Sequence, residues 1–314
     1  MDLRTISVIA LSARDFSSLE EKLREAVRWL EIAAGQGAEL VVFPECLQRY
    51  CGDGVGNLHR QTIEATACKA WRREMGILLE AAMRRKVSIV LPITHQDEAG
   101  LWNSFFLISP EGEEVWRYDK VSPTPEELAG GILPGRPGKL FNWRGVKVGG
   151  LICFDTCFPE NLNRLGRERA QLVLCPSLWP GGSQLNHFCK MNASRVALSY
   201  PAWSRIIDID GQEVIEGGYR QETLRFGFGA PVYTATLNFD RVSLYGNGNQ
   251  EQMVAILQKY GSRVKVTYDQ GNCLWFLESR DPDLAESEIL QEFRVVTAGD
   301  YFARCAQLIK EQGP

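Results

Sequence analysis

Three segments of this sequence each place a reactive side chain at the end of a strand-like run. Glu45 follows an apolar run and a proline, Cys153 ends the apolar run 146–152, and Lys120 leaves a strand-like segment for a loop rich in proline. In α/β proteins, ligand sites tend to lie at the carboxyl ends of buried strands. We therefore treat these three side chains as candidates for one site.

Together, a thiol, a carboxylate and an ammonium group can perform nucleophilic catalysis. A free thiol has a pKa near 8.5, so it is only a few per cent thiolate at neutral pH and gains from a nearby base. A glutamate whose pKa is raised by burial can serve as that base, and a lysine can stabilise the thiolate and a tetrahedral oxyanion. Each residue alone has an ordinary reading, as a surface Glu45, a packed Cys153 or a surface Lys120. The combination favours a cysteine-dependent hydrolase.

The beginning of the chain alternates strands and helices. An apolar run at 6–11 predicts a buried strand, and the serines and glutamates at 17–21 form a capping-box pattern that opens a helix. Two glycines, Gly35 and Gly37, end that helix, and the apolar run 40–43 predicts a second buried strand. This order is typical of a layered α/β fold.

The rest of the chain continues the mixed pattern. Turn signals predict hairpins that join 103–109 to 114–118, 141–143 to 146–152, 203–209 to 212–215, and 264–268 to 273–277. We expect helices at 63–86, 161–169 and 184–198, strands at 87–91, 172–175 and 232–238, a loop at 240–250, and one or two helices within 283–311.

Composition and charge limit the class of protein. The chain has 314 residues and a formal net charge of −4, which lacks the strongly basic footprint of a nucleic-acid binder. We expect no signal peptide and no transmembrane helix, because no apolar run is long enough. Nine cysteines without a secretory signal favour a reduced, cytoplasmic setting. The spacings Cys46/Cys51 and Cys153/Cys157 are weak metal signals, and we predict no metal site.

The segments around the three residues resemble one known family. Glu45 lies in Phe-Pro-Glu, Lys120 enters a Pro-rich loop, and Cys153 lies in Gly-x-x-Ile-Cys-Phe-Asp-x-x-Phe-Pro-Glu. The residues, their order and their rough spacing resemble the nitrilase, or carbon–nitrogen hydrolase, superfamily. The resemblance covers residues 1 to about 240.

The resemblance implies a fold and a mechanism. The family fold is a four-layer α-β-β-α sandwich, which usually assembles into dimers or larger oligomers. By the resemblance, Cys153 is the nucleophile and Glu45 the general base. Lys120 and the backbone N–H of Phe154 stabilise the oxyanion. An amide would yield a thioester with release of ammonia or an amine, and the thioester would then be hydrolysed without a metal or an organic cofactor.

Two segments point to different branches of this family. Many members carry a second glutamate after the lysine, and Lys-Val-Ser-Pro-Thr-Pro-Glu-Glu resembles the segment of true nitrilases that selects Glu127, with Glu126 as the alternative. Nitrilases usually have Trp-Glu after the nucleophile, whereas this chain has Phe154-Asp155, which is closer to amidases and carbamoylases. We therefore expect a small amide as substrate, with N-carbamoyl amines and nitriles as alternatives.

Other assignments are weaker. Trp179 follows the strand at 172–175 and is a candidate for the acyl pocket, and Tyr50, shortly after Glu45, is another. We expect residues 1–240 to form the hydrolase domain. Residues 241–314 are then an extension of the same domain with a role in oligomer contacts.

Three other readings compete with this one. A Cys–His hydrolase would need one of the three histidines, His59, His95 or His187, beside the thiol. An acyltransferase would pass the same thioester to an amine instead of water. The third alternative is not an enzyme but a catalytically silent binding protein of the same fold.

Overall fold

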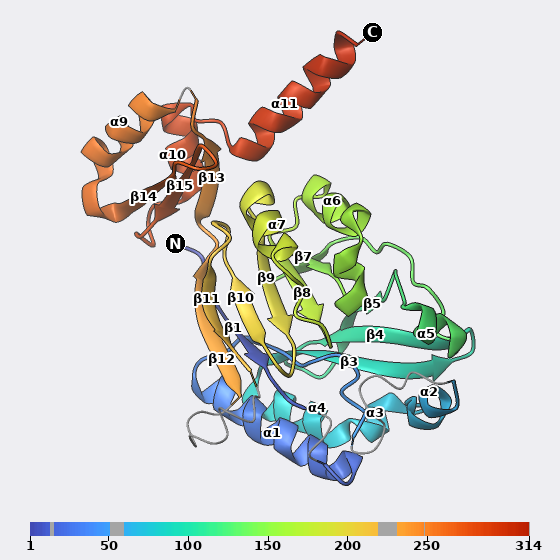
Figure 1. Ribbon diagram of the computed structural model, residues 1–314. Coiled ribbons are helices and arrows are strands. Elements are labelled where there is room, and N and C mark those ends of the chain that lie inside the picture. Colours follow the sequence, from blue (N-terminus) through green and yellow to red (C-terminus); the bar gives the residue numbers. More distant parts are fainter. Residues whose placement is uncertain (13–15, 51–59, 219–230, 248, 314) are drawn as a thin grey trace.

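The computed structural model describes residues 1–12, 16–50, 60–218, 231–247 and 249–313. Two six-stranded sheets form the centre of the larger part of the molecule (Figure 1). The first sheet has the order β12-β1-β2-β3-β4-β5, with β1 Leu3–Ile9, β2 Leu40–Val42, β3 Ser88–Asp97, β4 Gly100–Ile108, β5 Glu114–Asp119 and β12 Val232–Asn238. The second has the order β11-β10-β9-β8-β7-β6, with β6 Phe141–Trp143, β7 Val146–Gly150, β8 Leu172–Pro176, β9 Arg195–Ser199, β10 Ser204–Ile207 and β11 Glu213–Gly217.

Parallel strands lie at the centre of both sheets. In the first sheet β2 pairs in parallel with β1 and β3, and in the second β8 pairs in parallel with β7 and β9. The three residues of β2 and the five of β8 are all buried, as expected for parallel strands that are covered on both faces. Glu45, Cys153 and Trp179 follow the ends of β2, β7 and β8, and Lys120 directly follows the end of β5.

Helices cover the outer face of each sheet. Leu23 of α1 (Leu19–Gly35) and Leu78 of α4 (Gly76–Arg85) pack on the first sheet. Leu165 of α6 (Pro159–Arg167) and Phe188 of α7 (Gln184–Asn192) pack on the second. A third apolar cluster fills the space between the sheets. The chain therefore has the expected four-layer α-β-β-α sandwich.

Close contact between the sheets depends on a glycine of β7. A Cβ on Gly150 would lie 2.7 Å from a ring carbon of Tyr118 and 2.8 Å from the ring of Phe105. Tyr118 and Phe105 belong to β5 and β4 of the first sheet, so a side chain at Gly150 would push the two sheets apart. The glycine also lies three residues before Cys153, so the same contact fixes the strand that leads to the thiol.

Two predicted helices are wrong in extent. The segment 63–86 forms three helices, α2 Arg60–Thr66, α3 Trp71–Glu74 and α4, because Cys68 leaves the helical path to bridge to β3. The segment 184–198 is helical only to Asn192. Ala193 then adopts a left-handed conformation with φ 49°, and the next residues form the fully buried strand β9.

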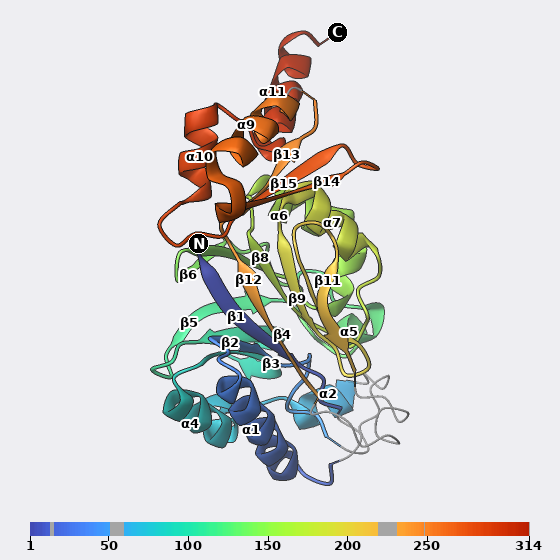
Figure 2. The same ribbon diagram turned by 90° about the vertical axis from the view of Figure 1, so that its left-hand side faces the viewer.

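Residues 241–313 form a separate small sheet with its own helices. The strands have the order β13-β15-β14, with β13 Arg241–Tyr245, β14 Val264–Asp269 and β15 Leu274–Ser279. The helices are α9 Gln250–Tyr260, α10 Glu286–Phe293 and α11 Ala298–Glu311. The predicted hairpin of β14 and β15 is confirmed, but the predicted loop at 240–250 is wrong, since it contains β13 and the start of α9. This C-terminal segment has its own buried apolar cluster, and it also contacts the part of the chain that carries the second large sheet, where Ile209 packs against Phe276. Helix α11 extends away from the rest of the molecule (Figures 1 and 2).

Candidate functional site

The end of β2 brings Glu45 into the interior between the sheets. The strand stops at Val42, and Glu45 follows within three residues with a buried side chain. Its Oε1 accepts hydrogen bonds from Asn103 Nδ2 at 2.7 Å and Lys120 Nζ at 2.9 Å. Its Oε2 accepts the backbone N–H of Leu178 at 3.0 Å. Three donors from three different elements therefore hold one carboxylate in place.

Lys120 lies between two carboxylates. Its Nζ is 2.9 Å from Oε1 of Glu45 and 2.7 Å from Oε2 of Glu127, and all three side chains are buried. Burial by itself lowers the pKa of Lys120, but the two carboxylates outweigh it and hold that pKa well above its usual range. Lys120 therefore remains a cation next to the site.

The short helix α5 (Pro125–Ala129) selects which of the two neighbouring glutamates faces Lys120. Thr124 caps this helix by accepting the N–H of Glu127 at 3.2 Å, and Glu127 Oε2 accepts the N–H of Thr124 at 2.7 Å. This capping box turns Glu127 inward, whereas Glu126 is exposed. The geometry thus favours Glu127 over Glu126 as the second carboxylate.

Cys153 occupies a sharp turn after β7. It has a positive φ of 47° and begins the short helix η1 (Cys153–Cys157). A left-handed conformation at a residue other than glycine costs about 1–3 kcal/mol and is held only by its surroundings. The first N–H groups of a helix have no partner within the helix, and the N–H of Phe154 is one of these. Its role as an oxyanion donor stays a prediction.

Asp155 holds this turn from behind. Its buried carboxylate accepts the N–H of Ile152 at 2.9 Å, the N–H of Ser122 at 2.7 Å and the hydroxyl of Tyr118 at 2.9 Å. It thereby ties the turn that carries Cys153 to the strand and the loop on either side of Lys120. In the sequence, Asp155 indicates only the branch of the family, whereas its hydrogen bonds show that it holds the turn that carries Cys153.

The surroundings of Cys153 favour the neutral thiol at rest. Burial raises the pKa of Cys153 well above its usual value, and the carboxylate of Glu45 adds to this. The ammonium of Lys120, the N–H of Leu178 and the hydroxyl of Ser177 lower the pKa of the thiol but do not outweigh burial. The same N–H of Leu178 donates to Oε2 of Glu45. The site thus has a neutral thiol whose pKa is shifted by the nearby charges of Glu45 and Lys120.

Asn103 is a member of this cluster that the sequence reasoning missed. Its one amide group donates to Oε1 of Glu45 and to Oε1 of Glu127, both at 2.7 Å, and its backbone carbonyl accepts the N–H of Lys120. The sequence feature that could have indicated Asn103 is the polar pair Asn103-Ser104 inside the apolar strand β4. Buried polar groups in a strand need hydrogen-bond partners. Asn103 therefore sets the relative position of the two carboxylates.

Replacement of Asn103 by alanine is expected to lower kcat/KM about 10–100-fold, since each hydrogen bond to a charged group contributes roughly 1.5–3 kcal/mol. Asn238→Ala is the control, since this buried asparagine donates to the carbonyl of Ser279 at 2.7 Å on another strand. A kcat/KM in Asn103→Ala equal to that of Asn238→Ala would contradict this role for Asn103.

The remaining candidates lie near the site without a described contact to the thiol. Trp179 is 47% exposed in the loop after β8, next to Leu178, and Tyr50 is half-buried after the segment of Glu45. The ring of Phe154 packs edge-on against Phe158. Within the described residues, no hydrogen bond or ring contact joins Trp179 or Tyr50 to Cys153, so their role in binding substrate stays a prediction.

The histidines give no support to a Cys–His pair within the described residues. His95 is buried in β3, where its Nε2 lies 3.2 Å from the hydroxyl of Ser104 and its ring packs edge-on against Phe106. His187 is exposed on α7. His59, like Cys51, lies outside the described residues.

We expect buried His95 to make the free energy of unfolding depend on pH. Burial lowers the pKa of His95 to about 4, with Arg117 adding to the shift. Between that pH and about 6.5 the unfolded chain binds one proton more than the folded chain, so acid favours unfolding. We expect this group to lower the free energy of unfolding by about 2 kcal/mol from pH 6.5 to pH 5. When urea unfolding is measured at pH 6.5 and at pH 5, His95→Asn should lack this part of the decrease in the free energy of unfolding, whereas His187→Asn should retain it. Equal decreases in the two variants would contradict the assignment.

Comparison with known proteins agrees with this geometry. Residues 6–244 match the model of the carbon–nitrogen hydrolase family. A deaminated glutathione amidase from Synechocystis sp. is 29% identical over 193 residues, which cover 57% of this chain and 68% of that protein. An (R)-stereoselective amidase from Pseudomonas sp. is 30% identical over 169 residues, which cover 54% of this chain and 58% of that protein.

Solved structures show the same fold. An amidase from Nesterenkonia sp. superimposes with a TM-score of 0.58 at 23% identity, over 74% of this chain and 90% of that one. The NitFhit protein of C. elegans superimposes with a TM-score of 0.61 at 18% identity, over 83% of this chain and 64% of that one. The family match spans well over half of the residues, including Glu45, Lys120 and Cys153. The chain therefore belongs to the carbon–nitrogen hydrolase family of the nitrilase superfamily, and it is a hydrolase of the amidase and nitrilase type.

Proposed function

We propose that this enzyme hydrolyses the carbon–nitrogen bond of a small amide through a thioester on Cys153. The observation that carries the proposal is the buried group of Glu45, Lys120 and Glu127, in which Nζ of Lys120 lies 2.9 Å from Oε1 of Glu45 and 2.7 Å from Oε2 of Glu127. The charges of Glu45 and Lys120 both act on the pKa of Cys153. The thiol of Cys153, the carboxylate of Glu45 and the ammonium of Lys120 together supply a nucleophile, a proton acceptor and an oxyanion stabiliser.

The first half of the reaction forms the thioester. Glu45 takes the proton of the thiol as the sulfur attacks the carbonyl carbon. Lys120 and the N–H of Phe154 then stabilise the oxyanion. Glu45 returns the proton to the nitrogen, the carbon–nitrogen bond breaks, and ammonia or an amine leaves. Glu127 keeps Lys120 charged and oriented during these steps.

The second half of the reaction restores the enzyme. Water enters the position of the departed nitrogen, Glu45 takes a proton from it, and the resulting hydroxide attacks the thioester carbon. The second tetrahedral intermediate collapses, the carbon–sulfur bond breaks, and the proton on Glu45 returns to the sulfur. One water is consumed for each amide, and the products are an acid and ammonia or an amine.

The relatives support an amide substrate. Several that match this chain are named amidases, including the two described above and an omega-amidase from Danio rerio that is 26% identical over 165 residues. In one structure of the Nesterenkonia amidase, the product of Michael addition of acrylamide is attached to the active-site cysteine of that protein. The Phe154-Asp155 pair after the nucleophile points to the same branch.

Nitrile hydrolysis is the second candidate. The segment from Lys120 to Glu127 favours it, and a nitrilase from Pyrococcus abyssi is 29% identical over 166 residues of this chain. A nitrile consumes two waters on the way to the acid, so the two substrates are distinguishable by their stoichiometry.

The experiment that tests the proposed function is an ammonia-release screen. We expect purified enzyme to release ammonia from at least one member of a panel of short aliphatic amides, ω-amides, N-carbamoyl amines and nitriles. Cys153→Ala should release none, while Cys157→Ala, which removes an exposed thiol four residues away, should retain the rate. Undiminished release by Cys153→Ala would disprove the mechanism. With an added amine, a product that contains the amine would show transfer instead of hydrolysis.

The assembly of the protein is a further part of the proposal. We infer a homodimer or a larger homo-oligomer in the cytoplasm, with residues 241–314 as an extension that contributes to the contacts between copies. The apolar side chains that α11 exposes, including Leu308 and Ile309, support this assignment. Within the described residues, no helix combines the length and the apolar character needed to cross a membrane.

A further inference from the structure

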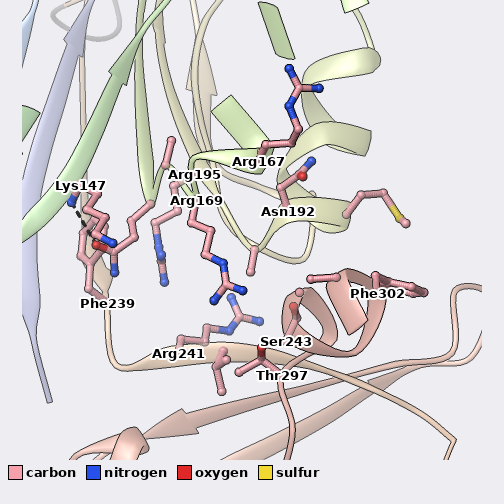
Figure 3. A pocket seen from close by; sticks show the side chains of 18 of the residues that line it. Lys147, Arg167, Arg169, Asn192, Arg195, Phe239, Arg241, Ser243, Thr297 and Phe302 are labelled. Carbon is pink, nitrogen blue, oxygen red and sulfur yellow. Dashed lines mark hydrogen bonds between the residues drawn. The ribbon is translucent and has the colours of Figure 1, made fainter. Parts of the chain in front are cut away.

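A cavity of about 660 Å³ lies where the C-terminal segment meets the second large sheet (Figure 3). One wall comes from the turn after α6 and from the beginnings of β7 and β9, and the other comes from β13 and the first turn of α11. The matched family region ends at residue 244, so α11 contributes from beyond it. The volume is within the range of small-molecule sites.

Basic side chains dominate the lining of this cavity. The guanidinium groups of Arg169, Arg195 and Arg241 approach one another from three separate elements (Figure 3). Lys147 and Arg167 add two further cations, whereas Glu286 is the one acidic residue among the described residues that line the cavity.

The carboxylates that balance these arginines are not part of the lining. Asp208 bonds to Arg195 at 3.0 Å and also to Arg241, and Asp300 bonds to Arg169 at 2.5 Å. Arg241 has two further carboxylates, Asp210 at 2.7 Å and Glu278 at 4.0 Å. These carboxylates fix the guanidinium groups in place and leave the wall itself basic.

Two cations at the cavity have no such counter-ion. Among the described residues, neither the ammonium of Lys147 nor the guanidinium of Arg167 makes an ion pair. Both side chains are exposed, so their charge is available to an incoming anion.

Neutral donors face the same space. The hydroxyl of Ser243 makes no hydrogen bond within the described part of the chain, although the residue lines the cavity and is only 2% exposed. Helix α11 has 14 residues and begins at the cavity wall, after its cap Thr297. The free N–H groups of its first turn and its dipole favour an anion at this end.

We propose that this cavity binds a small organic phosphate, with the phosphate between Arg169, Arg241 and Ser243 at the beginning of α11. Planar guanidinium groups bind phosphate oxygens in pairs, and the neutral donors supply further hydrogen bonds. The rings of Phe239 and Phe302, which also line the cavity, provide apolar surface for the organic part.

Asp300 competes with the ligand for Arg169. It occupies the first turn of α11 and is bonded to Arg169, so a phosphate has to share or displace this contact. Removal of the Asp300 charge therefore tightens phosphate binding if the cavity is a ligand site. It leaves the affinity unchanged or weaker if the ion pairs only stabilise the fold.

Isothermal titration of the full chain at fixed ionic strength tests the proposal. The probes are inorganic phosphate, ribose 5-phosphate and succinate, which separate phosphate alone, an organic phosphate and a dicarboxylate. We expect ribose 5-phosphate to bind most tightly and with saturation. Arg169→Gln should weaken it about tenfold or more, because a direct charge-assisted contact is lost. As a second variant, the exposed Arg167→Gln should weaken it only a few-fold, because it removes a nearby charge without a direct contact. Ser243→Ala should weaken it a few-fold, and Asp300→Asn should tighten it a few-fold.

Arg73→Gln is the matched control, because it removes the same charge from an exposed site on α3. Absence of saturable binding by ribose 5-phosphate, equal losses in Arg73→Gln and Arg169→Gln, or tighter binding of succinate would each overturn the proposal. So would an unchanged or weaker affinity in Asp300→Asn. The readout is binding alone, so the result does not depend on amide hydrolysis at Cys153.

Discussion

Replacement of Lys120 by methionine is expected to lower amide turnover at least about 10²–10³-fold, the loss typical for one oxyanion donor. It is also expected to lower the free energy of unfolding by about 3–5 kcal/mol. The reason is the pair of buried carboxylates on either side, Glu45 and Glu127, which lie within 2.9 Å of its ammonium. Without Lys120 they become two like charges in an apolar interior. Turnover and urea unfolding at pH 7 measure the two effects.

A double variant separates the loss of activity from the loss of stability. Lys120→Met with Glu127→Gln removes one cation and one carboxylate and so restores the original balance of charge. We expect it to regain much of the lost stability while it remains inactive, because the oxyanion has still lost its cation. Full stability in the single variant, or recovery of turnover in the double variant, would contradict the role assigned to Lys120.

Replacement of Glu45 by glutamine is expected to lower kcat about 10³-fold or more, near the upper range for general acid–base catalysis. Burial raises the pKa of Cys153, so the thiol depends on a proton acceptor, and the same acceptor activates water in the second half of the reaction. Alkylation of Cys153 by iodoacetamide at pH 7 should be slowed far less than turnover. Alkylation needs only the small fraction of thiolate, and the removal of the Glu45 charge favours that form.

Glu126→Gln is the control for this prediction. It makes the same chemical change on an exposed side chain one residue before Glu127, and we expect turnover close to that of the unaltered enzyme. Equal turnover in Glu45→Gln and Glu126→Gln would remove Glu45 from the mechanism and would leave the thiol without its base.

The positions of the reactive residues were predictable because they depend on local pattern. Apolar runs that end at a proline, at a loop or at a strand-to-helix turn are visible in the sequence, and the structure brings Glu45, Lys120 and Cys153 together from three such ends. The hairpins were equally visible, since Pro-Glu-Gly-Glu and Asp-Gly are turn sequences between strands of matching length.

The parts that were missed depend on contacts between distant segments. Asn103 looks like an ordinary strand residue until the folded chain places two carboxylates beside its amide group. The end of α7 was missed for a similar reason, because residues 195–199 are apolar enough for a helix and become a strand by pairing with β8. Contacts of this kind are fixed by tertiary packing rather than by local propensity.

Intact-protein mass spectrometry of an acid-quenched reaction tests the central claim most directly. With an amide identified by the screen, we predict an enzyme mass increased by the acyl group of that amide, located on the peptide that contains Cys153. The adduct should disappear after the substrate is consumed, and Cys153→Ala should show neither the adduct nor turnover. Turnover by Cys153→Ala, or an acyl group found on another residue, would contradict the thioester mechanism.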